Sequence, residues 1–526
     1  MVTKAISKRY YKGLPSQPPL IATTRPSPFQ DSEGPEAYSI LKELRYLTHH
    51  EITTVWDNGL AIEICRSLSS MSVNWTSLDL VHICNIGEPS GPAIVWIGVE
   101  FGALSFQRGS EVAISCQNLI ESSGIQDCYV EIRESCVMTN GGNRFLNPVP
   151  LSNPTFTAQD PYTATLGIPI SAKDTSWAEG TGGFYLSAGG EDNNIYLLTA
   201  RHVVLPIDTN NDNFNNQEYY RENNAKARQD ILVLGTSAFD NKLTAIDYEI
   251  SGQRFAITDA NERMAAVKGM EDTMSVGEFA EAQKDLQAAE NGLKALNALH
   301  YEIATHWTQK NERVLGELIW APPIRLSTEP GDYTLDLAII KIDPGILDGK
   351  NYLGNTINIG NKYTRQEFMN KVYLHHTSPT SFKYPPSRLV TLKDQVPESA
   401  LTKPPMIDAN ADPCLIVFKN GAMTGTTVGR AQCVSSYTRN YFKGQYQESR
   451  EWPVISTDKN SGAFSAKGDS GACVADAYCR IGGIITGGSG TNDSSDITYV
   501  TPISFIMKVL HGSKYFKHAH LNPALT

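Results

Sequence analysis

Apolar residues recur along the chain with two different periods, and these periods predict different secondary structure. From about residue 155 onward, short apolar runs of strand length are separated by clusters of Gly, Asn and Asp. The segment GGFYLSAGGEDNNIYLLTARHVV, residues 182–204, is typical of a β-hairpin, because two such runs flank a polar turn. The repetition of short strands predicts a mainly β domain over 155–526.

One segment, at about 259–313, breaks this β pattern. Ser275 and Glu278 fit a capping box, and apolar residues at 279–307 then recur at steps of three and four. This spacing predicts one apolar stripe along a helix. A shorter helix at about 261–274 is expected to pack against it, so that the two form a helical-hairpin insertion.

Residues 35–150 are predicted to form a small α/β domain. The segments at 35–47 and 58–71 have the pattern of amphipathic helices, and PAIVWIGV, residues 92–99, is a continuous apolar run. A helical pattern and then the alternating segment CYVEIRES, residues 128–135, follow. Strand, helix and strand with short links predict a βαβ unit.

Composition narrows the classes of function. Residues 1–34 are rich in Pro, Ser and Thr, which predicts a tail that is flexible or draped over the rest of the chain. The chain carries 45 basic and 56 acidic residues, a net charge of −11, which argues against a nucleic-acid partner held by phosphate contacts. No apolar run reaches membrane-spanning length, so no membrane partner is expected.

The cysteines and the N-terminal sequence predict an intracellular protein, cytoplasmic or nuclear. The nine cysteines are scattered without a CxxC pair, which fits reduced thiols. The N-terminal sequence has no apolar core of a secretory signal. No cofactor or metal is expected, because the eleven histidines include no HExxH motif and the adjacent pairs His49-His50 and His375-His376 have no third ligand-like partner.

Three segments carry residue types suited to nucleophilic catalysis. His202 follows the apolar run in LLTARHVV, Asp336 precedes the run in LDLAIIKI, and Ser470 lies between glycines in KGDSGACVAD. A serine hydroxyl is a weak nucleophile, which needs a base and a group that orients the base. Each segment alone is common, whereas the order His, Asp, Ser is specific.

With TARH, LDLAI and GDSG in this order, the chain resembles the trypsin/chymotrypsin-like serine proteases, closest in style to intracellular trypsin-like proteins of fungi. The resemblance covers about 180–515 apart from the helical insertion. It implies a chymotrypsin-like double β-barrel with a catalytic triad of His202, Asp336 and Ser470. It also implies an oxyanion hole formed by the backbone N–H groups of Gly468 and Ser470.

The same resemblance implies a substrate pocket and its preference. Phe464 falls at the pocket base, where trypsins carry Asp; Thr486, Gly487 and Gly488 would form one wall and Ile497 the other. Because an acidic base is absent, cleavage after Arg or Lys is not expected. A protein or peptide substrate with a small or aliphatic residue before the cleaved bond is expected instead.

The chain departs from secreted trypsins before the barrel. Those enzymes are switched on when a new N-terminal amine pairs with the Asp that precedes the nucleophile. The segment SAKDTSWAEGTGG offers no such start. Asp469 is therefore expected to have another partner, and proteolytic activation of the trypsin kind is not expected.

Two other functions stay open. The chain could be a catalytically silent or self-cleaving protease-fold scaffold or sensor that binds partners through its N-terminal domain or its helical arm. The insertion itself could be a lid, a docking arm, a contact for self-association or only a packed hairpin. A serine esterase could use the same triad, although no feature of the sequence favours it.

Overall fold

The computed structural model divides the chain into two compact units. It describes residues 4–14, 16–26, 41–47, 50–88, 91–100, 103–135, 144–206, 216–221, 227–378, 381–442 and 445–525. One unit comprises Met1–Asn140 and Ala256–Tyr301, and the other comprises Gly141–Phe255 and Glu302–Thr526. The three candidate catalytic residues all lie in the second unit.

A five-stranded sheet with the order β1-β5-β4-β3-β2 organises the first unit. Its strands are β1 Leu20–Thr23, β2 Lys42–Tyr46, β3 Trp75–Asn85, β4 Ala93–Val99 and β5 Cys128–Glu134. β4 and β5 are parallel and are joined by helix α4, Phe106–Ser122, as the sequence pattern predicts. α2 (Ile52–Val55), α3 (Ala61–Ser70) and α4 contribute to one apolar core, which buries Val95 and Ile132.

The described residues of the tail expected over 1–34 pack against the five-stranded sheet, as the draped alternative requires. Helix α1, Lys4–Arg9, precedes two buried tyrosines, and β1 pairs with β5. The Tyr11 hydroxyl donates to Glu131 at 2.6 Å, and the Tyr10 hydroxyl donates to the same buried carboxyl. Composition did not indicate this packing, because only a few residues, among them Tyr10 and Tyr11, provide the buried contacts. Residues 27–40 lie outside the described residues.

The helix expected at 35–47 is also wrong where the structure describes it, because Lys42–Tyr46 forms strand β2 at the sheet edge. Its residues pair antiparallel with β3, from Lys42 opposite Asn85 to Tyr46 opposite Val81. Pairing with a neighbouring strand outweighs the modest helix propensity of such a short segment.

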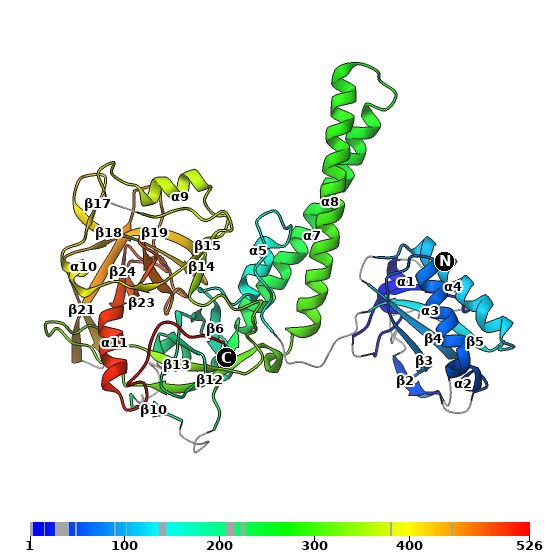
Figure 1. The fold of residues 1–526 in the computed structure, drawn as a ribbon, viewed down its shortest axis with the longest axis horizontal. Coiled ribbons are helices and arrows are strands. Elements are labelled where there is room, and N and C mark those ends of the chain that lie inside the picture. Colours follow the sequence, from blue (N-terminus) through cyan, green and yellow to red (C-terminus); the bar gives the residue numbers. More distant parts are fainter. Residues whose placement is uncertain are drawn as a thin grey trace. The chain divides into compact units, whose positions relative to one another are not determined.

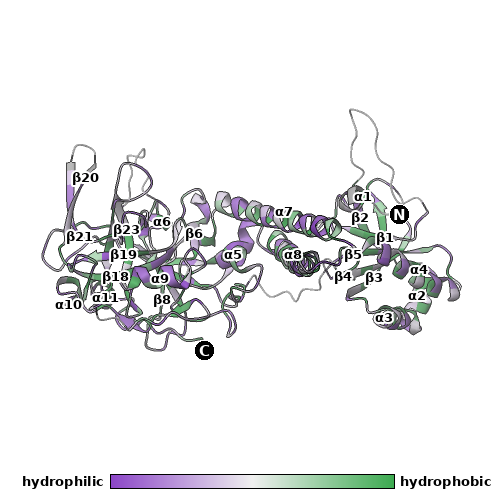
Figure 2. Cartoon of the chain, turned by 90° about the horizontal axis from the view of Figure 1, so that it is seen from above, coloured by the Kyte–Doolittle hydropathy of each residue, from purple (hydrophilic) through white to green (hydrophobic). Residues whose placement is uncertain are grey.

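The helical insertion is longer than the sequence pattern indicates. Helices α7 (Thr236–Ala266) and α8 (Thr273–His306) run alongside each other (Figure 1), so the first helix begins well before the expected start near 261. Hydrophilic and hydrophobic residues are mixed along α7 (Figure 2), which weakens its helical signal. Near the tip, Arg263 donates to Glu278 at 2.6 Å and to Asp285 at 2.7 Å and thereby links the helices.

Two sheets form most of the second unit, and their strands are antiparallel except for the pair β16 (Asp394–Gln395) and β23 (Arg480–Ser489). The eight-stranded sheet has the order β7-β6-β11-β12-β13-β9-β8, with β10 beside β12. Its strands are β6 Pro169–Ala172, β7 Gly180–Thr181, β8 Phe184–Leu186, β9 Tyr196–Thr199, β10 Tyr219–Tyr220, β11 Asp230–Val233, β12 Val314–Ala321 and β13 Ala338–Ile342. β8 and β9 form the hairpin that the sequence predicts.

The nine-stranded sheet has the order β16-β23-β22-β18-β19-β21-β20, with β17 beside β18 and β24 beside β21 and β23. Its strands are β16 Asp394–Gln395, β17 Met406–Ile407, β18 Pro413–Gly421, β19 Gly425–Gln432, β20 Ser436–Phe442, β21 Gln445–Ser456, β22 Cys473–Asp476, β23 Arg480–Ser489 and β24 Ile497–Pro502. The last strand leads into α11, Ile503–Gly512 (Figure 1).

The mainly β character expected over 155–526 is confirmed by these two sheets. The first unit contains Met1–Asn140 together with Ala256–Tyr301, whereas the sequence pattern predicts a separate domain over 35–150. Within the described part of the chain, no helix is both long and apolar enough to cross a membrane.

Candidate active site

His202 and Asp336 are brought together by the pairing of β9 with β13. Thr199, at the end of β9, lies opposite Ala338 at the start of β13. The chain then turns into the one-turn helix α6, Arg201–Val204, so that His202 faces the residue two positions before β13. His202 Nδ1 lies 2.5 Å from Asp336 Oδ2, and the His202 backbone N–H donates to Asp336 Oδ1 at 3.1 Å.

The electrostatics of this pair suit a base and its orienting group. The Asp336 side chain is 7% exposed and that of His202 is 31% exposed. Burial lowers the pKa of His202, but the Asp336 carboxylate outweighs it and the pKa is raised above its usual value. Burial raises the pKa of Asp336, while the imidazole and the backbone donors of His202 and Arg201 act more strongly and lower it. Asp336 is thus held ionised beside the imidazole.

Arg201 anchors the turn that carries His202, a role that the sequence did not indicate. Its buried guanidinium donates to the carbonyl oxygens of Ala321 at 2.7 Å, Pro322 at 2.9 Å and Gln217 at 2.9 Å. Three fixed carbonyls match the fork of donors that arginine presents. Through Arg201, the eight-stranded sheet therefore fixes the position of the His202 imidazole.

The loop that carries Ser470 packs directly against Thr199, the last residue of β9. Gly471 has φ +88°, a conformation that favours glycine. A Cβ at Gly471 would collide with the carbonyl oxygen of Thr181 and with the hydroxyl of Thr199. This close approach requires glycine and places Ser470 beside the end of β9.

Thr181 fixes the backbone of the Ser470 loop through two hydrogen bonds. Its N–H donates to the Ser470 carbonyl at 2.8 Å, and its hydroxyl donates to the Gly468 carbonyl at 2.9 Å. Gly468 has φ +102°. Within the described part of the chain, the N–H groups of Gly468 and Ser470 donate no hydrogen bond to the protein. Two such unused donors beside a serine are what stabilisation of an oxyanion requires.

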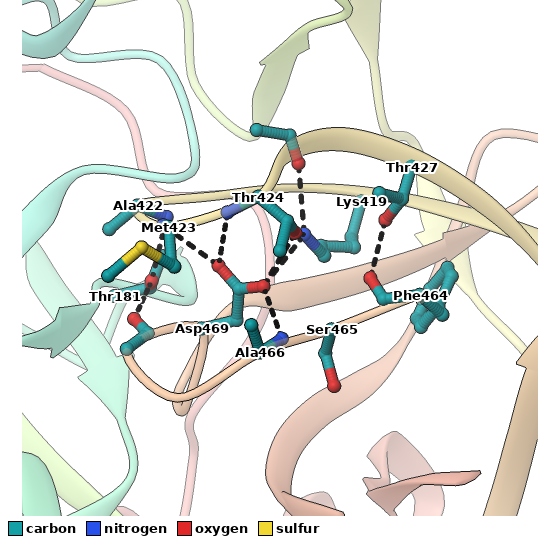
Figure 3. A network of polar contacts seen from close by, with 12 residues as sticks. Thr181, Lys419, Ala422, Met423, Thr424, Thr427, Phe464, Ser465, Ala466 and Asp469 are labelled. Carbon is teal, nitrogen blue, oxygen red and sulfur yellow. Dashed lines mark hydrogen bonds and ion pairs between the residues drawn. The ribbon is translucent and has the colours of Figure 1, made fainter. Parts of the chain in front are cut away.

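Asp469 has an internal partner, Lys419 of β18 (Figure 3). Lys419 Nζ lies 3.1 Å from Asp469 Oδ2, and both side chains are fully buried. The same oxygen accepts from the Thr424 hydroxyl at 2.6 Å and from the Ala466 N–H at 3.0 Å. Asp469 Oδ1 accepts from the N–H groups of Met423 at 3.0 Å and Thr424 at 3.2 Å. Asp469 is therefore completely satisfied without a chain terminus.

The charge of Lys419 depends on this arrangement. Burial lowers its pKa to about 8, and the Asp469 carboxylate acts in the opposite direction. Lys419 Nζ also donates to the Gly425 carbonyl at 2.9 Å and to the Thr424 hydroxyl. A buried ion pair stabilises a fold only when further hydrogen bonds complete it, and here both partners have them. Sequence patterns did not identify Lys419.

Phe464 does not lie at the floor of an open pocket. Its side chain is 2% exposed, and a Cβ on Gly429 would touch both its ring and Val454. Figure 3 shows the ring directed away from Asp469. The ring packs in the core of the nine-stranded sheet, since its contact with Gly429 removes it from solvent.

The register of β23 and β24 also differs from the expected pocket walls. Gly488 lies opposite Thr498, whereas Ile497 lies opposite Ser489. A register irregularity between Ile485 and Gly487 causes this offset. The residue that faces Gly488 is therefore Thr498 and not Ile497.

Two hydroxyls meet beside Gly488. Ser465 Oγ lies 2.6 Å from Thr498 Oγ1, and both residues are buried. The hydroxyl oxygen of Thr486, another expected wall residue, lies 3.3 Å from the hydroxyl oxygen of Thr501. The side chains in these two contacts are therefore small and polar.

Comparison of the sequence with protein families finds no match, and comparison with curated proteins finds none either. Among solved structures, the chain is similar to a glutamic acid specific serine protease, with 13% identity, 65% of this chain and 94% of that chain covered, and a TM-score of 0.26. It is also similar to a chymotrypsin of Cellulomonas bogoriensis, with 16% identity, 40% and 76% covered, and a TM-score of 0.21.

A third solved structure is a protease of M. tuberculosis in its active form, with 11% identity, 38% of this chain and 63% of that chain covered, and a TM-score of 0.17. All of these solved structures are proteases, and each is similar to this chain at a low TM-score.

The Lys419–Asp469 pair gives a first prediction. Lys419→Met keeps the length of the side chain but leaves the Asp469 carboxylate buried without its counter-charge. The free energy of unfolding should fall by about 3–5 kcal/mol. Urea unfolding followed by tryptophan fluorescence measures it.

The matched control is Lys362→Met, since Lys362 is exposed and donates to the Thr424 carbonyl of the same hairpin at 3.1 Å. This variant should change stability by no more than ~0.5 kcal/mol. Equal stability of the two variants would show that the buried ion pair does not support the fold.

Proposed function

We propose that residues 155–526 form a chymotrypsin-like double-barrel serine endopeptidase that hydrolyses peptide bonds by a His202–Asp336–Ser470 triad. The observation that carries the proposal is the His202–Asp336 pair, at 2.5 Å, at the end of the strand that contacts the Ser470 loop. The unused N–H groups of Gly468 and Ser470 support it as an oxyanion hole. A protein or peptide is the corresponding substrate.

In this mechanism Ser470 Oγ attacks the carbonyl carbon of the peptide bond while His202 Nε2 takes the hydroxyl proton. The carbonyl oxygen becomes an oxyanion that accepts hydrogen bonds from Gly468 and Ser470. His202 then gives the proton to the leaving amine, the C–N bond breaks, and an acyl-enzyme forms. Water repeats the sequence on the acyl-enzyme, releases the carboxylic acid and restores Ser470. Asp336 fixes the imidazole tautomer and stabilises the imidazolium.

We also propose that the enzyme needs no proteolytic activation. In trypsins the Asp before the nucleophile gains its cation only after cleavage. Here Lys419, from the same chain and buried in β18, supplies the cation to Asp469. The described cysteines are free thiols, which supports an intracellular location for such an enzyme.

For the substrate we propose a small or aliphatic residue before the cleaved bond. The pair of hydroxyls from Ser465 and Thr498 closes the space opposite Gly488. A long or charged side chain would have to displace them. Thr498 therefore takes the limiting role expected of Ile497.

One observation favours a second function, a scaffold or sensor that binds partners through the helical arm. Helices α7 and α8 and the turn between them expose several large apolar side chains. These are Tyr248, Phe255, Met270, Met274 and Val276. Exposed apolar residues of this size at neighbouring positions mark interaction surfaces more often than isolated ones do. Docking or self-association through the arm is compatible with an active or a silent triad.

Labelling by a fluorophosphonate probe tests the nucleophile directly. Full-length, uncleaved protein should be labelled at Ser470, because His202 and the oxyanion donors activate that hydroxyl. Mass spectrometry of the labelled peptide locates the site, and Ser470→Ala is the control.

Labelling that occurs only after cleavage upstream of Gly182 would contradict the proposed absence of activation. If the intact protein and Ser470→Ala behave alike in labelling, chain integrity and peptide hydrolysis, the scaffold function replaces the enzyme.

The pH dependence of hydrolysis follows from His202. The base must be neutral to accept a proton, and Asp336 raises the pKa of His202. Activity should therefore be lost as the pH falls through a value above the usual ~6.5. The acidic limb of kcat/KM for a peptide ester measures this pKa in the free enzyme.

Asp336→Asn removes the charge that raises the pKa of His202, so the acidic limb should move to lower pH while kcat falls by about 10⁴-fold. An acidic limb that stays in place in this variant would mean that another group controls the pH profile.

The substrate preference can be tested by opening the space opposite Gly488. Thr498→Gly removes a side chain that limits the substrate residue, so cleavage after Leu and Phe should increase by about 10-fold or more relative to cleavage after Ala. Ile497→Gly is the matched control and should leave the profile of a peptide library unchanged. The reverse pattern would show that Ile497 forms the wall.

A further inference from the structure

Thr334, two residues before Asp336, is held by the nine-stranded sheet through both its side chain and its backbone. Its hydroxyl donates to Glu451 Oε1 on β21. Its carbonyl accepts from the Thr501 hydroxyl on β24 at 2.8 Å. We call these three residues, Thr334, Glu451 and Thr501, the Thr334 clasp. The clasp ties the segment that carries Asp336 to the sheet that carries Ser470.

Glu451 is an unusual member of this clasp because it is a carboxyl group that is 4% exposed. Its Oε1 also accepts from the Ser449 hydroxyl at 2.6 Å, so both donors serve the same oxygen. Its Oε2 is buried and has no hydrogen-bond partner among the residues that the structure describes. Burying an ionised carboxylate with one oxygen left without a donor costs more free energy than burying the neutral acid, because an unpaired charge is more expensive to bury than an unpaired hydroxyl.

The groups that surround Glu451 also favour its neutral, protonated form. Asp336 and Tyr333 face it from the segment before β13, and neither supplies a positive charge. Arg450, its neighbour on β21, turns its guanidinium to the Ser435 hydroxyl and over the Tyr333 ring. Burial raises the pKa of Glu451, and the Asp336 carboxylate adds to this, against the opposing hydrogen bonds from Ser449 and Thr334.

We propose that Glu451 is a positioning residue that works as a neutral carboxylic acid, holding Thr334 and thereby the Asp336 carboxylate in place. This inference rests on the proposed function of the triad. A neutral acid accepts the Thr334 hydroxyl as well as a carboxylate does, but it adds no second negative charge beside Asp336. The charge that acts on His202 is then that of Asp336 alone.

Glu451→Gln is the decisive variant, because glutamine matches the shape and the neutrality of the protonated acid. It should keep kcat within about 3-fold, and the pKa of His202 should stay unchanged. Glu451→Met removes the acceptor, and Thr334→Val removes the donor without changing the shape of the side chain. Each variant should lower kcat by about 10-fold or more with little change in KM, because the Asp336 carboxylate would be displaced and this group acts on His202.

Proton NMR provides a readout that does not depend on hydrolysis. The imidazole pKa of His202 and the downfield signal of its Nδ1–H are measured in the wild type and in the three variants. The signal should persist in Glu451→Gln and shift or broaden in Thr334→Val and Glu451→Met.

Two results would overturn the proposal. If Glu451→Gln lowers the pKa of His202 by more than ~0.5, Glu451 is ionised in the native protein. If Thr334→Val leaves both kcat and the Nδ1–H signal unchanged, the clasp does not position Asp336. A wild-type chain that hydrolyses nothing would remove the proposed function, whereas the NMR measurements would still decide the protonation of Glu451 and the role of the clasp.

Discussion

The loop around Ser470 depends on one buried carboxylate, that of Asp469. An ion pair removed from water is favourable only when hydrogen bonds satisfy the remaining polar atoms. Lys419 supplies the charge, and the N–H groups of Met423, Thr424 and Ala466 complete the shell. Most of these donors belong to the hairpin of β18 and β19, so folding of the nine-stranded sheet also builds the anchor. The conformation of the Ser470 loop thus depends on residues of the nine-stranded sheet from which the loop extends.

The two sheets meet at contacts that lie within a few residues of the candidate catalytic side chains. Thr181 holds the carbonyls of the Ser470 loop, Gly471 abuts the end of β9, and Thr501 donates to the Thr334 carbonyl. Each contact involves backbone atoms, which move less than side chains. The relative positions of a base, its orienting group and a nucleophile are then set by sheet-to-sheet packing, and substitutions on the surface have little influence on them.

The sequence predicted those parts of the site that adjoin apolar strands. His202 and Asp336 each border a core strand, and such borders are visible as local patterns. Lys419 was missed, because a lysine in IVFKNG has the appearance of an exposed position, and only tertiary packing buries it. The pairing of Gly488 with Thr498 could not be predicted, because the irregularity in β23 shifts the register and leaves no local mark in the sequence. The start of α7 was also missed, because polar residues interrupt its apolar stripe.

The helical arm begins and ends at neighbouring strands. β11 precedes α7, β12 follows α8, and the two strands pair antiparallel with Leu232 opposite Val314. The arm therefore occupies the position that a short turn has in an ordinary β-hairpin. Because its two ends are already joined by the sheet, helices can lengthen, shorten or diverge there over evolution while the strand order stays the same. The arm is a place where new binding specificity can arise without any change in the two sheets.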